Sequence, residues 1–333
     1  MLDPFKHIQA GQTTELESGA NFRAATHVWS QPEINALRLA VAARRPLLLR
    51  GEPGSGKSQL ARAAAWALYK GHPLVAVVHP RFEASELLYS FDAMARLMDA
   101  QLGDKGQWDP TNEKYLTRGV LWQAFDQSGQ GQHHPVVLID EIDKADADVP
   151  NSLLDVLANR SFEVPMRKAG QRIEADDAFA PLILFTTNEE RELPAAFVRR
   201  CVVLNLNPPK DGTKLQAWMT ERVQAHADVR GTISAEVVKE VVRQTLSDRQ
   251  VVQGQGYPPV GLAEAIDLVR ALQELTAGVP GAERTQLQLD LLCDLSAYAL
   301  IKHDVTAPGQ ERPPLLRPAK LAEGDAGLPP SAG

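Results

Sequence analysis

Short apolar runs alternate with amphipathic stretches through the first two thirds of the chain. Five runs are short enough for buried strands, and they occupy residues 46–50, 74–80, 136–139, 182–188 and 201–206. Between them, apolar residues recur at helical spacing over residues 30–45, 58–71, 84–102, 117–127 and 142–160. Strands interleaved with helices are typical of a parallel sheet covered on both faces. We therefore expect an α/β fold with a five-stranded parallel sheet.

The pattern changes beyond Pro208, where only helical periods remain, over residues 212–228, 233–248, 261–277 and 284–303. The last residues are rich in Pro and Gly and poor in large apolar side chains, which is typical of disorder. The first residues are polar without a clear period. The predicted domains are a loosely structured segment (1–26), an α/β nucleotide-binding core (27–207), a helical domain (208–304) and a disordered tail (305–333).

Two segments interrupt the alternation of strands and helices. Residues 161–175 form two short alternating runs on either side of 168–170, which predicts a β-hairpin. Residues 103–119 contain the Gly, Pro and Asn of a surface excursion, and Trp108 lies within it.

Composition and charge narrow the classes of function. Of the 333 residues, 44% are hydrophobic and 23% charged, as in ordinary soluble domains. No apolar stretch approaches the length of a membrane span, and the N-terminus lacks the basic start and apolar run of a secretory signal. The two cysteines lie far apart in the sequence, which is typical of free thiols in a reducing cytoplasm. The net charge of −7 argues against a dedicated nucleic-acid surface.

A glycine-rich segment joins the first predicted strand to the helix that follows. It reads GEPGSGKS and matches G-x-x-x-x-G-K-[ST], a loop whose backbone N–H groups surround phosphates. Lys57 is expected to reach the β- and γ-phosphates, and the Ser58 hydroxyl to bind Mg²⁺. The residues predicted to hold the nucleotide in this loop are Gly51, Glu52, Pro53, Gly54, Ser55, Gly56, Lys57 and Ser58.

Two adjacent carboxylates follow the apolar run at 136–139. At the end of a buried parallel strand, Asp140 can hold the Mg²⁺ shell, and Glu141 can polarise a water molecule. Together with the glycine-rich loop, this pair predicts binding and hydrolysis of a nucleoside triphosphate. ATP is expected rather than GTP, because the guanine-reading motif N-K-x-D is missing from the sequence.

The order of these segments resembles the AAA+ ATPases and, within them, the MoxR-like branch. The resemblance spans most of 28–303 and is carried by residues 27–58, 87–101, 136–146, the predicted hairpin, TTN at 186–188 and LPAAFVRRC at 193–201. It implies a P-loop core followed by a small helical lid, with ATP and Mg²⁺ as ligands. It further implies a homo-oligomeric ring, usually a hexamer, that acts on a protein partner, often one with a von Willebrand factor A domain.

The resemblance also implies roles for single residues. Asn188 matches sensor 1, which holds the attacking water, and Arg200 matches the arginine finger, with adjacent Arg199 as the alternative. The family's sensor 2 arginine has no match, because the corresponding segment contains no arginine before Arg270. Trp108 falls in an insert that faces the ring pore in this family, where it would touch a substrate or serve as a local anchor.

Three functions follow from these observations. The leading one is a cytoplasmic ring ATPase that remodels a partner protein. A nucleotide-dependent regulatory switch in a signalling or defence system is the second, and the missing sensor 2 arginine favours it modestly. A nucleic-acid motor or loader is the third, and the acidic balance of charges argues against it.

Overall fold

The computed structural model divides the chain into two compact units, Met1–Asn207 and Pro208–Gly333. It describes residues 3–19, 22–101, 113–164, 172–228, 231–254 and 256–300. Trp108, the predicted hairpin turn at 168–170 and the predicted tail at 305–333 lie outside the described residues.

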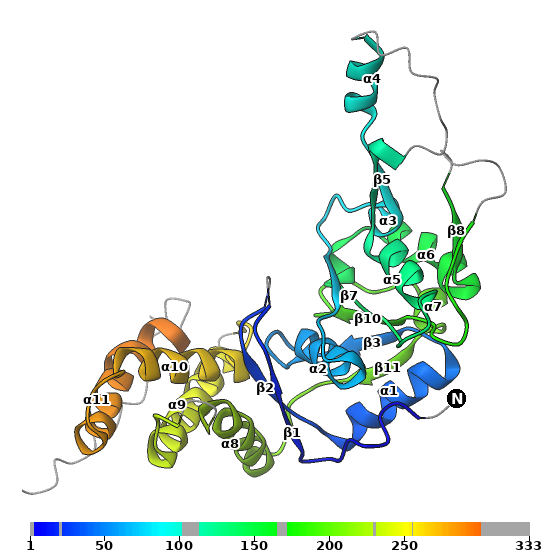
Figure 1. The fold of residues 1–333 in the computed structure, drawn as a ribbon. Helices are drawn as coiled ribbons and strands as arrows, with labels where there is room; N and C mark the ends of the chain where they lie inside the picture. Colours follow the sequence, from blue (N-terminus) through cyan, green and yellow to red (C-terminus); the bar gives the residue numbers. More distant parts are fainter. Residues whose placement is uncertain are drawn as a thin grey trace, which may run out of the picture. The chain divides into compact units, whose positions relative to one another are not determined.

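A five-stranded parallel sheet forms the centre of the first unit (Figure 1). In chain order its strands are β3 (Leu47–Arg50), β4 (Leu74–Val77), β7 (Val136–Asp140), β10 (Leu182–Thr187) and β11 (Val202–Asn205). Their order in the sheet is β11-β3-β10-β7-β4, with every pair parallel. The predicted α/β fold is confirmed. Because β10 lies between β3 and β7, the carboxyl ends of these three strands meet at one edge.

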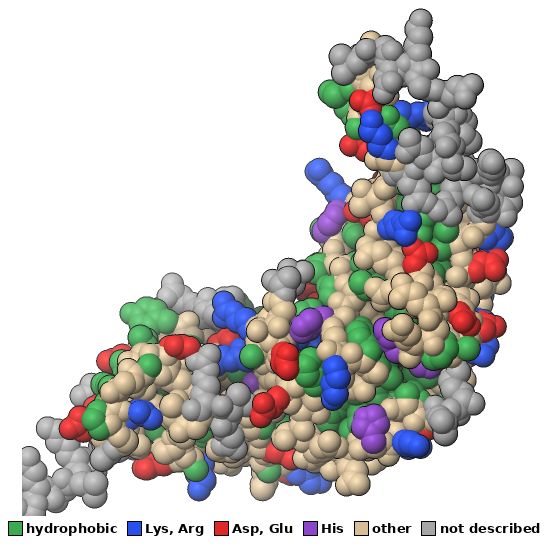
Figure 2. Space-filling view, viewed as in Figure 1, with side chains coloured by type: hydrophobic (Ala, Val, Ile, Leu, Met, Phe, Trp, Pro, Cys, Tyr) green, Lys and Arg blue, Asp and Glu red, His purple; other side chains and the backbone are tan. Residues whose placement is uncertain are grey.

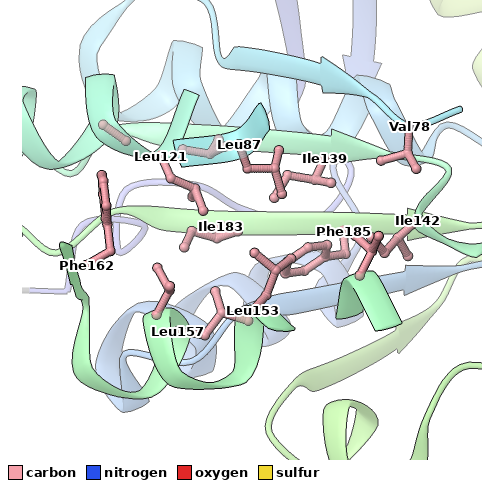
Figure 3. Packing of buried hydrophobic residues seen from close by; sticks show 14 of the residues in the cluster. Val78, Leu87, Leu121, Ile139, Ile142, Leu153, Leu157, Phe162, Ile183 and Phe185 are labelled. Carbon is pink, nitrogen blue, oxygen red and sulfur yellow. The ribbon is translucent and has the colours of Figure 1, made fainter. Parts of the chain in front are cut away.

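Alternate residues of the strands face opposite sides of the sheet, as the pleat requires. Ile139, Ile183 and Phe185 pack into one cluster with Leu121 and Leu153 from the covering helices (Figure 3). The helices on this side are α3 (Ala84–Leu88), α5 (Val120–Ser128), α6 (Asp148–Asn159) and α7 (Ala195–Val198). The intervening strand residues pack with α1 (Gln31–Ala43) and α2 (Lys57–Tyr69) on the other side. Burial on both faces explains why the strands are continuous apolar runs.

The N-terminal segment is part of this packed unit, which differs from the expectation of a loosely structured lead-in. Strands β1 (Thr13–Leu16) and β2 (Ala25–Val28) pair antiparallel. Phe5 is fully buried and Leu16 is 3% exposed, both in the cluster under α1 and α2. Arg62 of α2 donates hydrogen bonds to the carbonyls of Glu17 and Arg23. The apolar residues of this segment are too widely spaced to produce a period.

The helix predicted over residues 84–102 is broken by a short strand. Strand β5 (Tyr89–Phe91) separates α3 from α4 (Ala93–Gln101) and pairs antiparallel with β6 (Leu116–Arg118). The 3-10 helix η1 (Glu113–Tyr115) precedes β6, so the end of the predicted excursion is regular structure. The predicted hairpin forms from β8 (Ser161–Glu163) and β9 (Arg172–Glu174).

The described part of the second unit consists of helices, as predicted for residues beyond 208. They are α8 (Gly212–Asp228), α9 (Ala235–Gly254), α10 (Leu262–Leu275) and α11 (Gly281–Leu300). Their apolar faces meet in a core that includes Val223, Val241 and Leu272, each fully buried. Among the described helices of both units, none is long and apolar enough to cross a membrane.

The two cysteines differ in their surroundings. Cys201 is buried beside α7, and burial raises the pKa of its thiol to about 12, whereas Cys293 is half-buried. Because only the thiolate reacts with alkylating reagents, we expect iodoacetamide at pH 8 to modify Cys293 and to spare Cys201 until the protein unfolds. Mass spectrometry of native and denatured samples measures this, and equal labelling of both thiols in the native protein would contradict it.

Candidate active site

The glycine-rich loop, residues 51–58, connects β3 to the first turn of α2. Gly56 has a φ of 97°, in the left-handed region that side chains rarely adopt. A Cβ on Gly51 would lie 2.8 Å from the carbonyl oxygen of Leu206. Two of the glycines are therefore required by the backbone itself. The loop ends at the N-terminus of α2, where backbone N–H groups and the helix dipole favour an anion.

The Lys57 side chain lies against the backbone of this loop. Its Nζ donates hydrogen bonds to the carbonyl oxygens of Gly51 at 2.8 Å and Glu52 at 2.9 Å. Burial lowers the pKa of Lys57, and the charges of Asp140 and Asp143 act in the opposite direction. The ammonium is thus held beside the loop by backbone acceptors, which phosphate oxygens can replace.

Ser58 and Asp140 meet at the edge of the sheet although 82 positions separate them. Ser58 Oγ lies 3.0 Å from Oδ1 and 3.1 Å from Oδ2 of Asp140. Oxygen ligands on adjacent corners of an octahedral Mg²⁺ shell lie about 3.0 Å apart, given bond lengths of about 2.1 Å. Ser58 and Asp140 therefore fit the predicted Mg²⁺ site in both chemistry and spacing.

Thr186 of β10 organises the acidic pair, and the sequence analysis missed it. Its hydroxyl is fully buried, donates to Asp140 Oδ1 at 2.5 Å and accepts the backbone N–H of Glu141 at 2.8 Å. Phe185 lies opposite Ile139 in the register of β10 and β7, which places Thr186 beside Asp140. One hydroxyl thus fixes the position of both consecutive acidic residues.

Glu141 and Asn188 are in direct contact. Asn188 Nδ2 donates to Glu141 Oε1 at 3.3 Å, and Lys144 Nζ donates to Oε2 at 2.7 Å. Glu141 has a φ of 60° and a ψ of 47°. A left-handed backbone at a residue other than glycine costs about 1–3 kcal/mol and is concentrated at functional sites. The structure brings the predicted base and the predicted sensor together.

Asp143 anchors the loop that carries Asn188, a contact that the sequence analysis also missed. Its side chain is buried, and Oδ2 accepts the backbone N–H of Glu190 at 3.0 Å. Thr187 Oγ1 accepts the N–H of Glu189 at 2.9 Å within the same loop. The loop after β10 is thereby tied to the segment that follows Glu141.

Arg199 and Arg200 lie elsewhere on the unit, at the end of α7. Both residues are exposed. Arg200 Nη1 donates to the carbonyl oxygen of Ala196 at 3.1 Å, within its own helical turn. Their position at the surface makes both guanidinium groups accessible to another molecule.

Comparisons with known proteins find similarity to one domain family. Residues 46–201 match the family model of the AAA domain, dynein-related subfamily. A candidate ATPase from Cytophaga hutchinsonii is 16% identical, with a TM-score of 0.36 and 73% of each chain covered. NtrX from Brucella abortus, in complex with ADP, is 17% identical, with a TM-score of 0.41 and 77% of this chain and 52% of that chain covered. The comparison with curated proteins finds no match.

The matched span begins one residue before β3 and ends at Cys201. It contains the loop, the acidic pair, Thr186, Asn188 and Lys144, and therefore the hydrogen bonds that join them.

Proposed function

We propose that this chain, whose residues 46–201 form an AAA ATPase domain, is a MoxR-like ring ATPase that remodels or activates a partner protein. The observation that carries the proposal is one constellation at the edge of the sheet. The contacts of Lys57, Ser58, Asp140, Glu141 and Asn188 join the phosphate loop, the acidic pair and the end of β10.

In this proposal each residue has one step, which its contacts support. The loop N–H groups and Lys57 bind the β- and γ-phosphates of ATP. Mg²⁺, held by Ser58 and Asp140, would supply positive charge to the phosphate oxygens. Glu141 accepts a proton from water as the water oxygen attacks the γ-phosphorus. The bond to the β-phosphate oxygen breaks, ADP and phosphate leave, and the Asn188 amide orients the water.

The surface position of the α7 arginines supports assembly into a ring. An arginine finger stabilises the charge of the transition state, and it can be supplied by a neighbouring molecule. Arg200 takes this role in the proposal, with Arg199 as the alternative, and each completes the site of the next subunit. The proposed assembly is a hexamer, as the resemblance implies.

Mixing two inactive variants tests this assembly. Arg200→Ala and Glu141→Gln are each expected to lose hydrolysis, and their equimolar mixture is expected to regain it. In random rings about a quarter of the interfaces combine an intact base with an intact finger. Phosphate release measures the gain. The double variant Glu141→Gln/Arg200→Ala mixed with Arg200→Ala is the control, because it forms no complete interface. An inactive mixture in rings shown by native mass spectrometry to be mixed would contradict a finger in trans.

An exposed apolar stripe supports a protein as the partner. Met94, Leu97 and Met98 of α4 are each more than half exposed, at helical spacing. Exposed apolar clusters mark surfaces that contact other proteins. We propose a von Willebrand factor A domain protein as the partner, and capture on Glu141→Gln rings loaded with ATP, followed by mass spectrometry, tests this.

The regulatory switch remains a second candidate because of the start of α10. There Glu264 accepts the N–H of Gly261 at 3.0 Å, and the first arginine of the helix is Arg270. A helical lid that lacks an arginine at the start of α10 is consistent with slow hydrolysis of ATP. Steady-state hydrolysis with and without the captured partner separates a switch from a motor.

One face of the described surface argues against a nucleic-acid motor. Acidic and basic side chains are interspersed on the face seen in Figure 2, where the described residues form no continuous basic stripe. Binding to nucleic acid relies on such a stripe to contact phosphates.

A further inference from the structure

Lys144 contacts the residue that acts as the base in the proposed function. After Glu141 the chain enters the 3-10 helix η2 (Ile142–Lys144), and the N–H of Lys144 donates to the carbonyl oxygen of Glu141 at 3.0 Å. This turn brings Lys144 Nζ within 2.7 Å of Glu141 Oε2. Because Asn188 holds Oε1, an N–H donor engages each oxygen of the carboxylate.

The contact between Asn188 and Glu141 leaves no space for the attacking water between them. The two atoms are 3.3 Å apart. A water molecule that accepts from one and donates to the other would separate them by about 4.5 Å, given two hydrogen bonds of about 2.8 Å. The structure therefore shows a closed arrangement of the two side chains, which have to move apart before water can lie between them.

The charges around Lys144 belong to two segments. Glu141 and Asp143 lie on its own side of the site, and Glu190 follows Asn188 in the loop after β10. Asp143 and Glu190 are themselves linked through the backbone N–H of Glu190. Lys144 is thus placed where it holds the base and the sensor loop in one arrangement.

We propose that Lys144 is a positioning residue that restrains Glu141 in the closed arrangement and thereby limits the basal rate of ATP hydrolysis. The inference rests on the proposed function, since it requires Glu141 to be the base. A charge-assisted contact of 2.7 Å has to loosen each time Glu141 turns toward a water molecule. Removing the ammonium should make that movement easier and leave the nucleotide contacts intact.

The first comparison uses three variants of the full chain. Lys144→Met removes the charge and keeps an unbranched side chain. It is expected to raise basal kcat about two- to fivefold, the range accounted for by one partly exposed ion pair, with KM for ATP and Tm unchanged. Lys144→Arg keeps a cation and is expected to hydrolyse at the parent rate. Lys239→Met, an exposed lysine of α9, is the matched control and is expected to change nothing.

The outcomes separate this inference from the proposed function. A folded Lys144→Met chain whose kcat is unchanged or lower would overturn the restraint. A Lys144→Arg rate as high as that of Lys144→Met would also overturn it, because charge would then be irrelevant. Glu141→Gln is made in two backgrounds, one with the native Lys144 and one with Lys144→Met. Hydrolysis at the parent rate in these combinations would refute Glu141 as the base. Combinations that stay slower by about 10²-fold or more, together with no gain from Lys144→Met alone, would refute only the restraint.

Discussion

The Glu141→Gln variant is expected to bind ATP as tightly as the parent chain and to hydrolyse it about 10²–10⁴ times more slowly. The amide has the shape of the carboxylate but does not accept a proton from water. Lys57, Ser58 and Asp140 keep their contacts, because Thr186 reaches the backbone N–H of Glu141 and not its side chain. Phosphate release at saturating ATP and Mg²⁺ measures the rate, and a fluorescent nucleotide measures the affinity.

The same exchange at an exposed position outside the contacts of the site provides the control. Glu15→Gln, on β1, removes one negative charge from the same unit and is expected to leave both rate and affinity unchanged. Hydrolysis by Glu141→Gln at the parent rate would mean that another group takes the proton. Loss of affinity in this variant would instead place Glu141 among the groups that bind the nucleotide.

The parts of the site that could be predicted from the sequence are those built from one continuous segment. Residues 51–58 follow a strand and end in the first turn of a helix. One local pattern therefore predicts the positions of the glycines, Lys57 and Ser58. Asp140 and Glu141 likewise end their own strand. The meeting of Ser58 with Asp140 then follows from the parallel sheet, because both lie at the carboxyl ends of its strands.

The contacts that escaped prediction depend on which strands are neighbours. Thr186 acts on Asp140 only because β10 lies beside β7 in one particular register. Its signal was present in TTN at 186–188, where a hydroxyl precedes the sensor asparagine. Lys144 gave no such signal, because its role depends on the sharp turn that follows the left-handed Glu141.

Long-range packing explains the two differences in the fold. Phe5 and Leu16 are buried against α1 and α2, but eleven positions separate them and no period connects them. Over residues 84–102 the helical period is real, yet Tyr89–Phe91 pairs with Leu116–Arg118 and interrupts it. Aromatic residues favour strands when a partner strand is present, and a one-segment pattern does not reveal that partner.

The loss of ATP binding in Lys57→Ala is the second large effect that we expect. ATP at a concentration of 100 times its Kd stabilises the parent chain by about 2.7 kcal/mol. This raises the Tm of a domain of this size by about 5–10 °C. Without the Lys57 ammonium the β- and γ-phosphates lose their main charge partner. The variant is therefore expected to show no rise in Tm at the same ATP concentration, as measured by thermal unfolding with and without ATP and Mg²⁺.

A second substitution distinguishes lost charge from lost packing, because the Lys57 side chain is buried. Lys57→Met fills the same space without the ammonium and is expected to lose the ATP-dependent rise in Tm as completely as Lys57→Ala. Without ATP it is expected to melt no lower than the parent, since burial lowers the pKa of Lys57 and so disfavours its charged form. Lys70→Met, exposed just after the end of α2, should keep the full rise. A Lys57→Met chain that kept it would show that the loop N–H groups bind the phosphates without the lysine.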